Sequence, residues 1–150
     1  MNIKQLFLVG LLTAFVITPL LADSHDGSVS DVVASHEELS GFNDIVSRLD
    51  SEAVDDEESI ALFAPHDDAL ADVDVDDLSD GEVADLFDGH STVGLASTTP
   101  LEFVEWFGTN AGERVTVEQM DDAIYLNGTV EVIETIKVSN GFIHVISDVL

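Results

Sequence analysis

The chain has 150 residues, of which 31 are Asp or Glu and 4 are Lys or Arg, giving a formal net charge of -27 at pH 7. Because 45% of its residues are hydrophobic, it can build a folded core, and a disordered acidic tail is excluded. The scarcity of Lys and Arg argues against nucleic-acid binding, and the absence of cysteine excludes disulfides, thiolate metal sites and thiol nucleophiles.

The N-terminus has the layout of a secretory signal peptide. Lys4 precedes an apolar run at residues 6–17, and Pro19 follows before a Leu-Leu-Ala tripeptide that ends at Ala22. We expect cleavage after Ala22, so that residues 1–22 are a signal peptide and residues 23–150 are one exported domain. An uncleaved anchor is the alternative, but the run is shorter than the ~20 apolar residues that span a bilayer.

The acidic excess belongs to the exported domain, because Lys4 is the only charged residue in the predicted signal peptide. Such a charge density destabilises a compact chain in dilute salt, and it is tolerated at high ionic strength, where the Debye length is ~3 Å at 1 M. Aspartate outnumbers glutamate, and Lys137 is the one lysine of the exported domain. We interpret this surface as halophilic adaptation. A specific cation-binding function is the alternative.

The first part of the exported domain is predicted to be helical. After a polar leader at residues 23–28, the spacing of Val29, Val32 and Val33 predicts one helix, and Ser40 is a candidate N-cap for a second. The second helix carries apolar residues at spacings of three and four: Phe42, Ile45, Val46 and Leu49.

A short buried strand is predicted next. An acidic loop at residues 50–59 leads to the apolar run 60–64, which Pro65 ends. A helix that begins near Asp67 would then turn two apolar residues inward, Ala69 and Leu70.

Two further helix starts are predicted from capping signals. Ser79 and Glu82 form a capping box after an aspartate-rich connection at residues 72–78. Thr99 and Pro100 form a second helix-start signal, with Thr99 as the N-cap and Pro100 as the first helical residue. This last helix is expected to end at Gly108 and to carry three apolar residues: Leu101, Val104 and Phe107.

The last third predicts antiparallel strands. They are expected from Arg114 onward, where Val115 and Val117 alternate, and at residues 123–126, 130–138 and 142–149. Two Asn-Gly pairs, Asn127-Gly128 and Asn140-Gly141, supply the tight turns. With helices first and strands last, the fold class is α+β.

Two stretches resemble the signature boxes of fasciclin domains. Residues 60–70, IALFAPHDDAL, are similar to the first box, T-V-F-A-P-T-D-x-A-F. Residues 138–150, VSNGFIHVISDVL, are similar to the second, A-S-N-G-x-I-H-V-I-D-x-V-L. Residues 86–90 resemble the family's L-L-x-Y-H element, residues 126–128 its penultimate strand and turn, and residues 29–35 its first helix, so the resemblance covers nearly all of the exported domain.

This resemblance implies an α+β fold, a compact β-wedge flanked by helices, and an extracellular module of adhesion or matrix association without enzymatic activity. The family's structural motif falls on Phe63, Ala64, Pro65, Asp67, His90, Asn140, Gly141 and His144. The chain departs from the family pattern at His66, Leu70, Gly89 and Ser147. Gly89 replaces the tyrosine of an element implicated in receptor binding by animal relatives.

His90 and His144 are the candidates for a catalytic base or a metal ligand, with Asp88 or Asp148 as a carboxylate partner. On the predicted strand His144 is in phase with Phe142, which favours a hydrogen-bonded core histidine. No Gly-x-Ser-x-Gly elbow is present. We therefore expect no catalytic residue, no cofactor-binding residue and no enzymatic activity.

The aspartate-rich connection begins like a calcium loop. Asp72, Asp74 and Asp76 take the first, third and fifth places, but Asp77 stands where the loop needs Gly and Val83 where it needs Glu. We expect no metal site here beyond weak Ca²⁺ binding, and a solvated loop is the preferred interpretation.

Two surface features remain open. Asn127-Gly128-Thr129 matches a glycosylation acceptor, although the hairpin explains the Asn-Gly pair without a sugar. Trp106, with Phe103 and Phe107, could form an exposed patch that stacks on sugars or binds a partner, but core packing is the expected use for most of the three.

The sequence therefore predicts a secreted, extracellular or periplasmic, non-enzymatic adhesion or matrix-interaction module with a salt-adapted acidic surface. Its partner would be a cell-surface or matrix protein or a polysaccharide, with no nucleic acid and no membrane span after cleavage. The alternative is a soluble extracellular binding protein for divalent cations or a small ligand.

Overall fold

A computed structural model of the chain describes residues 23–24, 26–49, 54, 59–93 and 99–150. The predicted signal peptide at residues 1–22 lies outside the described residues, and so does most of the predicted loop at 50–59. Within the described ranges, no helix is long and apolar enough to cross a membrane.

The described part of the chain combines helices with one sheet. The helices are α2 (Val29–Ser35), α3 (Ser40–Arg48) and α5 (Asp80–Gly89), with short 3-10 helices η2 (Val75–Asp77) and η3 (Leu101–Phe103). The strands are β1 (Asp23–Ser24), β2 (Ile60–Pro65), β3 (Ser91–Thr92), β4 (Trp106–Gly108), β5 (Arg114–Met120), β6 (Ala123–Leu126), β7 (Val130–Val138) and β8 (Gly141–Ile146).

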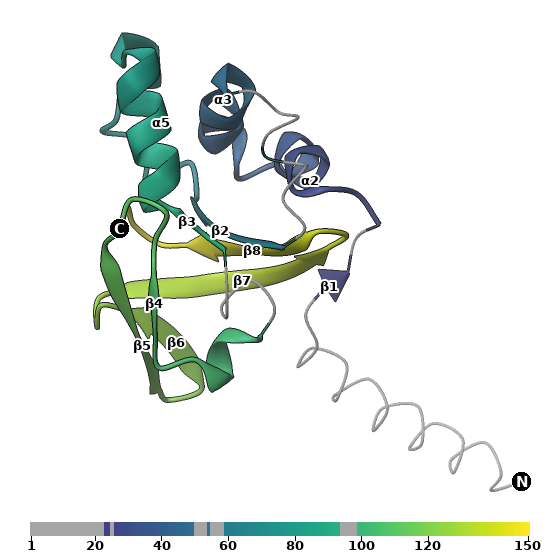
Figure 1. Ribbon diagram of the computed structural model, residues 1–150, viewed down its shortest axis with the longest axis vertical. Coiled ribbons are helices and arrows are strands. Elements are labelled where there is room, and N and C mark those ends of the chain that lie inside the picture. The colour runs from purple at the N-terminus through teal and green to yellow at the C-terminus, as the bar shows by residue number, and fades with distance from the viewer. Residues whose placement is uncertain (1–22, 25, 50–53, 55–58, 94–98) are drawn as a thin grey trace, which may run out of the picture.

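The strand order is β3-β2-β8-β7-β6-β5-β4, and β1 pairs with β7 outside this path. The three α-helices lie above the β2 and β8 part of the sheet, whereas β4, β5 and β6 lie below it (Figure 1). The α+β class and the wedge of strands flanked by helices are thereby confirmed.

Capping boxes start α2 and α5. The Ser28 hydroxyl accepts the Asp31 N–H, and the Asp31 carboxylate accepts the Ser28 N–H at 3.2 Å. Ser79 and Glu82 form the same reciprocal pair, with the Ser79 N–H donating to Glu82 Oε2 at 2.8 Å. Each box satisfies donors that a helix start leaves open, and the predicted start of α5 is confirmed.

The start of α3 differs from the prediction. Ser40 is the first residue of the helix rather than its N-cap, and Leu39 at the N-cap makes no side-chain hydrogen bond. The Asp67 carboxylate replaces the missing cap, because Oδ1 accepts the Gly41 N–H at 2.8 Å and Oδ2 accepts the Ser40 hydroxyl at 2.7 Å. A residue distant in sequence therefore caps this helix.

The helix predicted near Asp67 is absent. Successive turns follow β2, in which the Ala69 N–H donates to the His66 carbonyl and the Val73 N–H to the Leu70 carbonyl, both at 2.9 Å. The Asp67 carboxylate accepts from α3, and the N–H groups of Asp68 and Ala69 donate to His66 Nδ1 instead. Leu70 is buried as expected, whereas Ala69 is only partly buried.

The prediction of a helix between Thr99 and Gly108 was also wrong. Pro100 is the N-cap of η3, which is a single 3-10 turn, and the chain then extends into β4. The three apolar residues that suggested a helix are all buried: Leu101, Val104 and Phe107. A tight turn followed by a strand buries these three residues in one core. A helix would bury the same residues, so their spacing does not distinguish the two structures.

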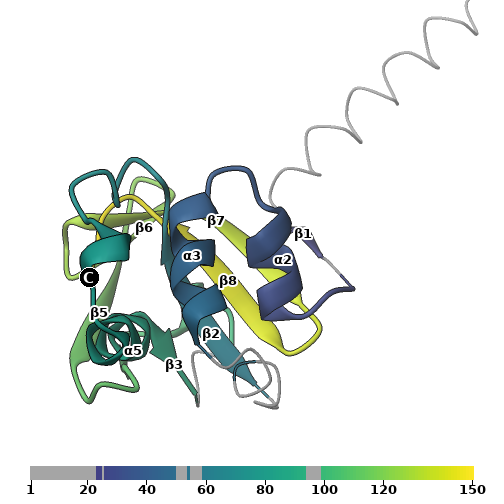
Figure 2. The same cartoon turned by 90° about the horizontal axis from the view of Figure 1, so that it is seen from above.

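Strand β2 lies in the middle of the sheet, parallel to β8 and antiparallel to β3. All its residues are buried, because both faces of the sheet are covered. Ile60, Leu62 and Ala64 belong to the core beneath the helices, and Ala61 and Phe63 belong to a second core between β2 and the lower strands. Seen from above, α2 and α3 lie over the β2 and β8 region (Figure 2).

The two predicted turns have different outcomes. Leu126 pairs with Val130, so the loop between β6 and β7 has three residues, and its first two, Asn127 and Gly128, take positive φ of 53° and 75°. In the second hairpin Val138 pairs with Gly141, so Ser139 and Asn140 form the turn and Gly141 begins β8. The predicted Asn140-Gly141 turn is therefore displaced by one residue.

Strand β1 was not predicted. Asp23 and Ser24, part of the supposed polar leader, pair in parallel with Ile136 and Lys137 of β7. Two residues without apolar alternation give no strand signal. Their conformation depends on the partner strand, which is more than 100 residues away in sequence.

The two edge strands approach each other at one end of the sheet. The Asn110 N–H donates to the Ser91 carbonyl at 2.8 Å, and the Thr92 hydroxyl donates to the Gly108 carbonyl at 2.6 Å. These contacts bring the sheet close to a closed barrel around the second core.

Candidate functional site

The two family-like boxes lie side by side as β2 and β8. Phe63 is opposite His144, Ala64 opposite Val145 and Pro65 opposite Ile146 in the parallel ladder. Segments about 80 residues apart in sequence therefore form one central pair of strands, of which β2 is buried throughout and β8 is buried from Ile143 onward. The arrangement gives these residues structural contacts rather than an open cleft.

Asn140 joins the last hairpin to the first helix. Its carbonyl accepts the Ile60 N–H at 2.9 Å, and its side-chain Oδ1 accepts the Val29 N–H at 3.1 Å. Val29 is the first residue of α2, where the N–H has no partner within the helix. The Asn140 Nδ2 atom is buried and has no hydrogen-bond partner among the described residues.

His144 is buried between aromatic rings. Its ring centroid lies 5.0 Å from that of Phe63 and 5.9 Å from that of Phe142, and Nδ1 is 3.0 Å from the Thr135 hydroxyl. Burial lowers the pKa of His144 to about 3, because a charged ring would be desolvated there. Its Nε2 has no partner among the described residues. The ring is therefore neutral at physiological pH and closed to solvent.

His90 connects the end of α5 to the C-terminal residue of the chain. Its Nδ1 donates to the Leu86 carbonyl at 2.8 Å, and its Nε2 accepts the Leu150 N–H at 3.0 Å. Burial lowers the pKa of His90, and the hydrogen bond to Leu86 and the charge of Glu113 offset this in part. Both ring nitrogens are satisfied only in the neutral form, so the ring is not available as a proton acceptor.

The proposed carboxylate partners do not reach the histidines. The Asp148 carboxylate accepts the Val149 N–H, and neither Asp88 nor Asp148 bonds to a ring within the described structure. Nor do the described residues contain a group of three or more His, Cys, Asp or Glu side chains that could hold a metal ion. The histidines thus have the geometry of structural residues.

The aspartate-rich connection surrounds η2, with Asp72, Asp74 and Asp76 exposed and not gathered into such a group. Arg48, at the end of α3, holds this segment. Its guanidinium donates to the Val75 and Leu78 carbonyls, both at 2.8 Å, and to Asp80 Oδ1 at 2.9 Å. No local pattern predicts this contact, because Arg48 lies about 30 residues before its partners.

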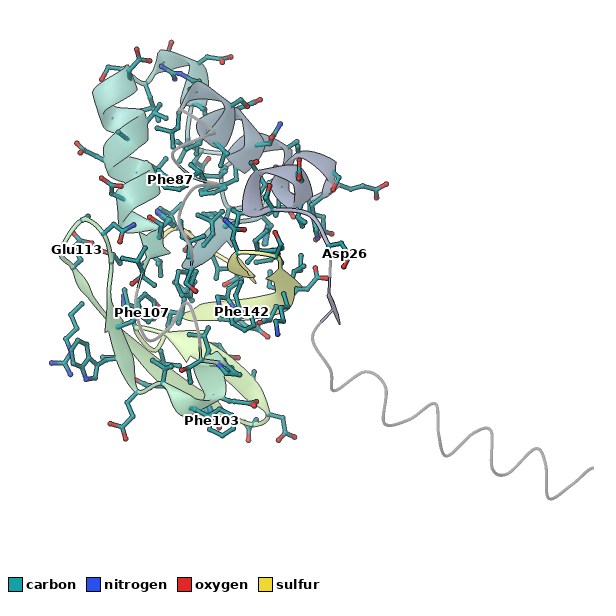
Figure 3. The ribbon with its side chains drawn as sticks, turned by 45° about the vertical axis from the view of Figure 1, so that its right-hand side comes forward. Asp26, Phe87, Phe103, Phe107, Glu113 and Phe142 are labelled. Carbon is teal, nitrogen blue, oxygen red and sulfur yellow. The ribbon has the colours of Figure 1, made fainter. Side chains whose placement is uncertain are left out.

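The exposed aromatic residues are on a different face. Phe107 is buried and stacks on Phe63 at 4.5 Å, but Phe103 is 72% exposed and Trp106 is 51% exposed. In Figure 3, Phe107 lies within the ribbon and Phe103 at its lower end. The expectation that most of the three pack in the core was wrong, because η3 and β4 turn two of them outward.

These residues surround a hollow between the edge strands, which we call the seam. It has a volume of about 500 Å³ and is lined by Thr92, Val93 and residues 103–108. Thr92, Val104 and Phe107 are buried, whereas Val93, Phe103 and Trp106 are exposed. The Arg114 guanidinium lies 4.4 Å from the centre of the Trp106 ring. The seam therefore brings exposed apolar side chains close to the edges of two strands, β3 and β4.

The family model of the fasciclin domain matches residues 37–150. The chain belongs to the fasciclin family. Fasciclin domains are modules of extracellular proteins that take part in cell adhesion, and the matched range contains both β2 and β8.

A solved structure of a FAS1 domain pair from the insect cell adhesion molecule Fasciclin I is similar to this fasciclin domain, with a TM-score of 0.63 and 14% sequence identity. The match covers 83% of this chain and 50% of that one, so the chain spans half the length of the structure it matches. At this identity the likeness shows the fold. No curated protein matches the chain in sequence.

Proposed function

We propose that the protein is a secreted, non-enzymatic fasciclin module that mediates adhesion or matrix association. Membership of a family of extracellular adhesion modules supports the general role. The signal-peptide layout of residues 1–22 supports export. The neutral, buried and fully bonded state of His90 supports a structural rather than a catalytic use of this ring.

The exposed aromatic surface of the seam carries the proposal. Phe103 and Trp106 stay in water on a chain that buries Phe42, Phe63 and Phe107 almost completely. Leaving a large aromatic ring in water forgoes roughly 2 kcal/mol of burial free energy. The position of both rings beside one hollow, rather than their exposure alone, is what supports a partner-binding surface.

The acidic surface is proposed to adapt this module to salt. Apart from Lys4, the only Lys or Arg residues are Arg48, Arg114 and Lys137, against 31 acidic residues. Arg48 and Arg114 are already engaged with Asp80 and with the Trp106 ring. Charge repulsion is therefore little compensated within the chain, and high ionic strength would screen it.

Retention of the purified, fluorescently labelled protein on whole cells and extracellular matrix of its source tests the proposal. Binding is measured at fixed high NaCl, with calcium and with a chelator. We expect saturable retention that falls in Phe103→Ser and Trp106→Ser and persists in Ile133→Ser, which replaces a hydrophobic residue of similar exposure, 49%, away from the seam. Absence of retention in every condition would overturn the proposal.

Comparison of retention with calcium and with chelator tests the alternative function, the binding of divalent cations or a small ligand. Loss of retention in chelator would give the aspartate-rich connection a role in weak Ca²⁺ binding. The seam volume of about 500 Å³ also lies within the range of small-ligand sites, which favours the soluble binding protein as the second candidate. That candidate predicts saturable uptake of one small species without retention on cells.

A further inference from the structure

Within the described residues, no strand pairs with the edge of β4 that faces the seam. The Val117 N–H donates to the Glu105 carbonyl at 2.9 Å, and the Thr109 N–H donates to the Glu113 carbonyl at 2.8 Å. In an antiparallel ladder, bonded pairs alternate with non-bonded pairs. Trp106, opposite Thr116, is therefore a non-bonded position whose N–H and C=O point away from β5. Neither group has a partner among the described residues.

Strand β3, on the other side of the seam, has hydrogen-bond partners among the described residues for some of its edge groups, unlike Trp106 of β4. The Phe63 N–H donates to the His90 carbonyl at 2.7 Å, which by the same alternation turns the Ser91 backbone away from β2. The Ser91 carbonyl already accepts the Asn110 N–H, and the Gly108 carbonyl accepts the Thr92 hydroxyl. The two edges are thus joined at one end of the seam, and beyond it no described residue bonds to the backbone of Trp106.

The seam walls suit an extended chain. The buried side chains of Val104 and Phe107 line it together with the exposed Val93, Phe103 and Trp106. A strand added along Trp106 would place alternate side chains toward this mixed apolar and polar lining and the others toward solvent. Free edge groups beside apolar side chains are the two features that β-strand addition requires.

Charge indicates the character of such a strand. The chain carries a formal charge of -27, and exposed Glu105 lines the seam. Arg114 already lies over the Trp106 ring, so a cationic side chain is compatible with this face. Basic side chains on the solvent side of the added strand would be attracted, and acidic ones repelled.

We propose that the seam binds an extended segment of a partner protein with alternating apolar and basic residues, which pairs with the Trp106 edge of β4 as an added strand. The inference rests on the proposed function, because it names the class of partner that an adhesion module would hold.

The test uses the acetylated and amidated peptide Lys-Val-Lys-Val-Lys-Val-Lys, titrated into the whole protein at fixed high NaCl. Two control peptides carry N-methyl groups on the Val residues or on the Lys residues, because only one of these sets can face β4. We expect one control to bind about tenfold more weakly, the loss expected for one or two hydrogen bonds. A peptide with Glu in place of Lys is expected to bind more weakly than the Lys peptide, and the difference is expected to shrink as NaCl is raised.

Hydrogen exchange locates the bound strand. The Trp106 amide is expected to exchange rapidly in the free protein and to be protected by the peptide, with the Phe107 amide, already bonded within the ladder, as the reference. Trp106→Ala keeps the N–H and loses the ring, and Ile133→Ala is its control. Equal binding by both N-methylated peptides, or a Trp106 amide protected before peptide is added, would overturn the proposal.

Retention on cells separates the two proposals. If the peptide does not bind the wild-type protein and the Trp106→Ala variant is still retained on cells, the seam proposal is overturned. Adhesion then stands, through a surface other than the seam. Peptide binding with Trp106 protection in a protein that is not retained would overturn adhesion and leave the seam site in place.

Discussion

A Cβ atom on Gly141 would lie 1.8 Å from the carbonyl oxygen of Ile60. Gly141 is the first residue of β8 and pairs with Ile60 across the parallel ladder. Its φ of 148° is also one that other residues rarely adopt. Glycine is therefore required here by the close approach of two backbones, in addition to the turn that precedes it.

Gly141→Ala is expected to destabilise the protein by about 3 kcal/mol or more, because strained φ and the overlap with Ile60 act together. Urea unfolding at fixed NaCl measures the change. Gly89→Ala is the control, because a Cβ there meets nothing within 4 Å and its φ is not positive. A Gly141→Ala protein as stable as Gly89→Ala would contradict the assigned β2–β8 pairing.

The buried histidines are expected to make the protein sensitive to mild acid. The ordinary pKa is 6.5, and burial lowers that of His144 to about 3, so between these values the unfolded chain binds a proton that the folded chain does not. The contribution of His144 is complete above pH 6.5 and is lost progressively as the pH falls toward 3, and His90 acts in the same direction. At pH 5 the loss from His144 alone is roughly 2 kcal/mol.

Urea midpoints measured from pH 8 to pH 5 at constant NaCl check this expectation. Carboxylates stay ionised over most of this range, so the slope reports the histidines. His144→Phe keeps a ring between Phe63 and Phe142 and removes the titrating group. Its stability is expected to vary less with pH than that of the wild type. An unchanged slope would show that His144 does not stay neutral in the fold.

Local signals in the sequence were sufficient where neighbouring residues decide the structure. The strands at 123–126 and 130–138 have the predicted bounds, because alternation and the Asn127-Gly128 turn are encoded within them. The Ser79 capping box is local in the same way. Two boxes at domain-length separation were specific enough to identify the family.

Features that depend on distant partners could not be predicted. The cap of α3 comes from Asp67, and the aspartate-rich connection is held by Arg48. β4 was mistaken for part of a helix because Leu101 and Phe107 face one core through two different conformations. The seam exists only because the sheet curls until β3 meets β4, so no linear pattern in the sequence indicates it.

The cap on α3 gives a third prediction. Partial burial raises the pKa of Asp67, but hydrogen bonds from Gly41 and Ser40 and the charge of His66 outweigh it and lower the pKa below its ordinary 3.8. The stabilisation is therefore present above pH 3.8 and is lost as the pH falls through the lowered pKa. Asp67→Ala at pH 7 should cost about 1 kcal/mol, the typical value of an N-cap.

Asp68→Ala is the matched control for Asp67→Ala, because Asp68 is exposed and its carboxylate does not cap a described helix. It should leave the urea midpoint nearly unchanged. Asp67→Asn should lie between the two, since one amide oxygen can still accept the Gly41 N–H. Equal effects of Asp67→Ala and Asp68→Ala would contradict the cap and point to a general charge effect.

Salt is expected to stabilise the protein through screening of its acidic surface. The Debye length falls from ~30 Å at 0.01 M to ~3 Å at 1 M, so repulsion among 31 acidic residues weakens steeply over this range. Thermal melting followed by circular dichroism should show Tm rising with NaCl.

The triple variant Asp72→Asn, Asp74→Asn and Asp76→Asn removes three exposed charges and should melt higher than the wild type at low salt, with the difference shrinking at 1 M. Addition of millimolar CaCl₂ at constant ionic strength separates screening from binding, because a calcium site would raise the Tm of the wild type but not of the triple variant. A Tm indifferent to NaCl would refute the salt-adapted interpretation of the surface.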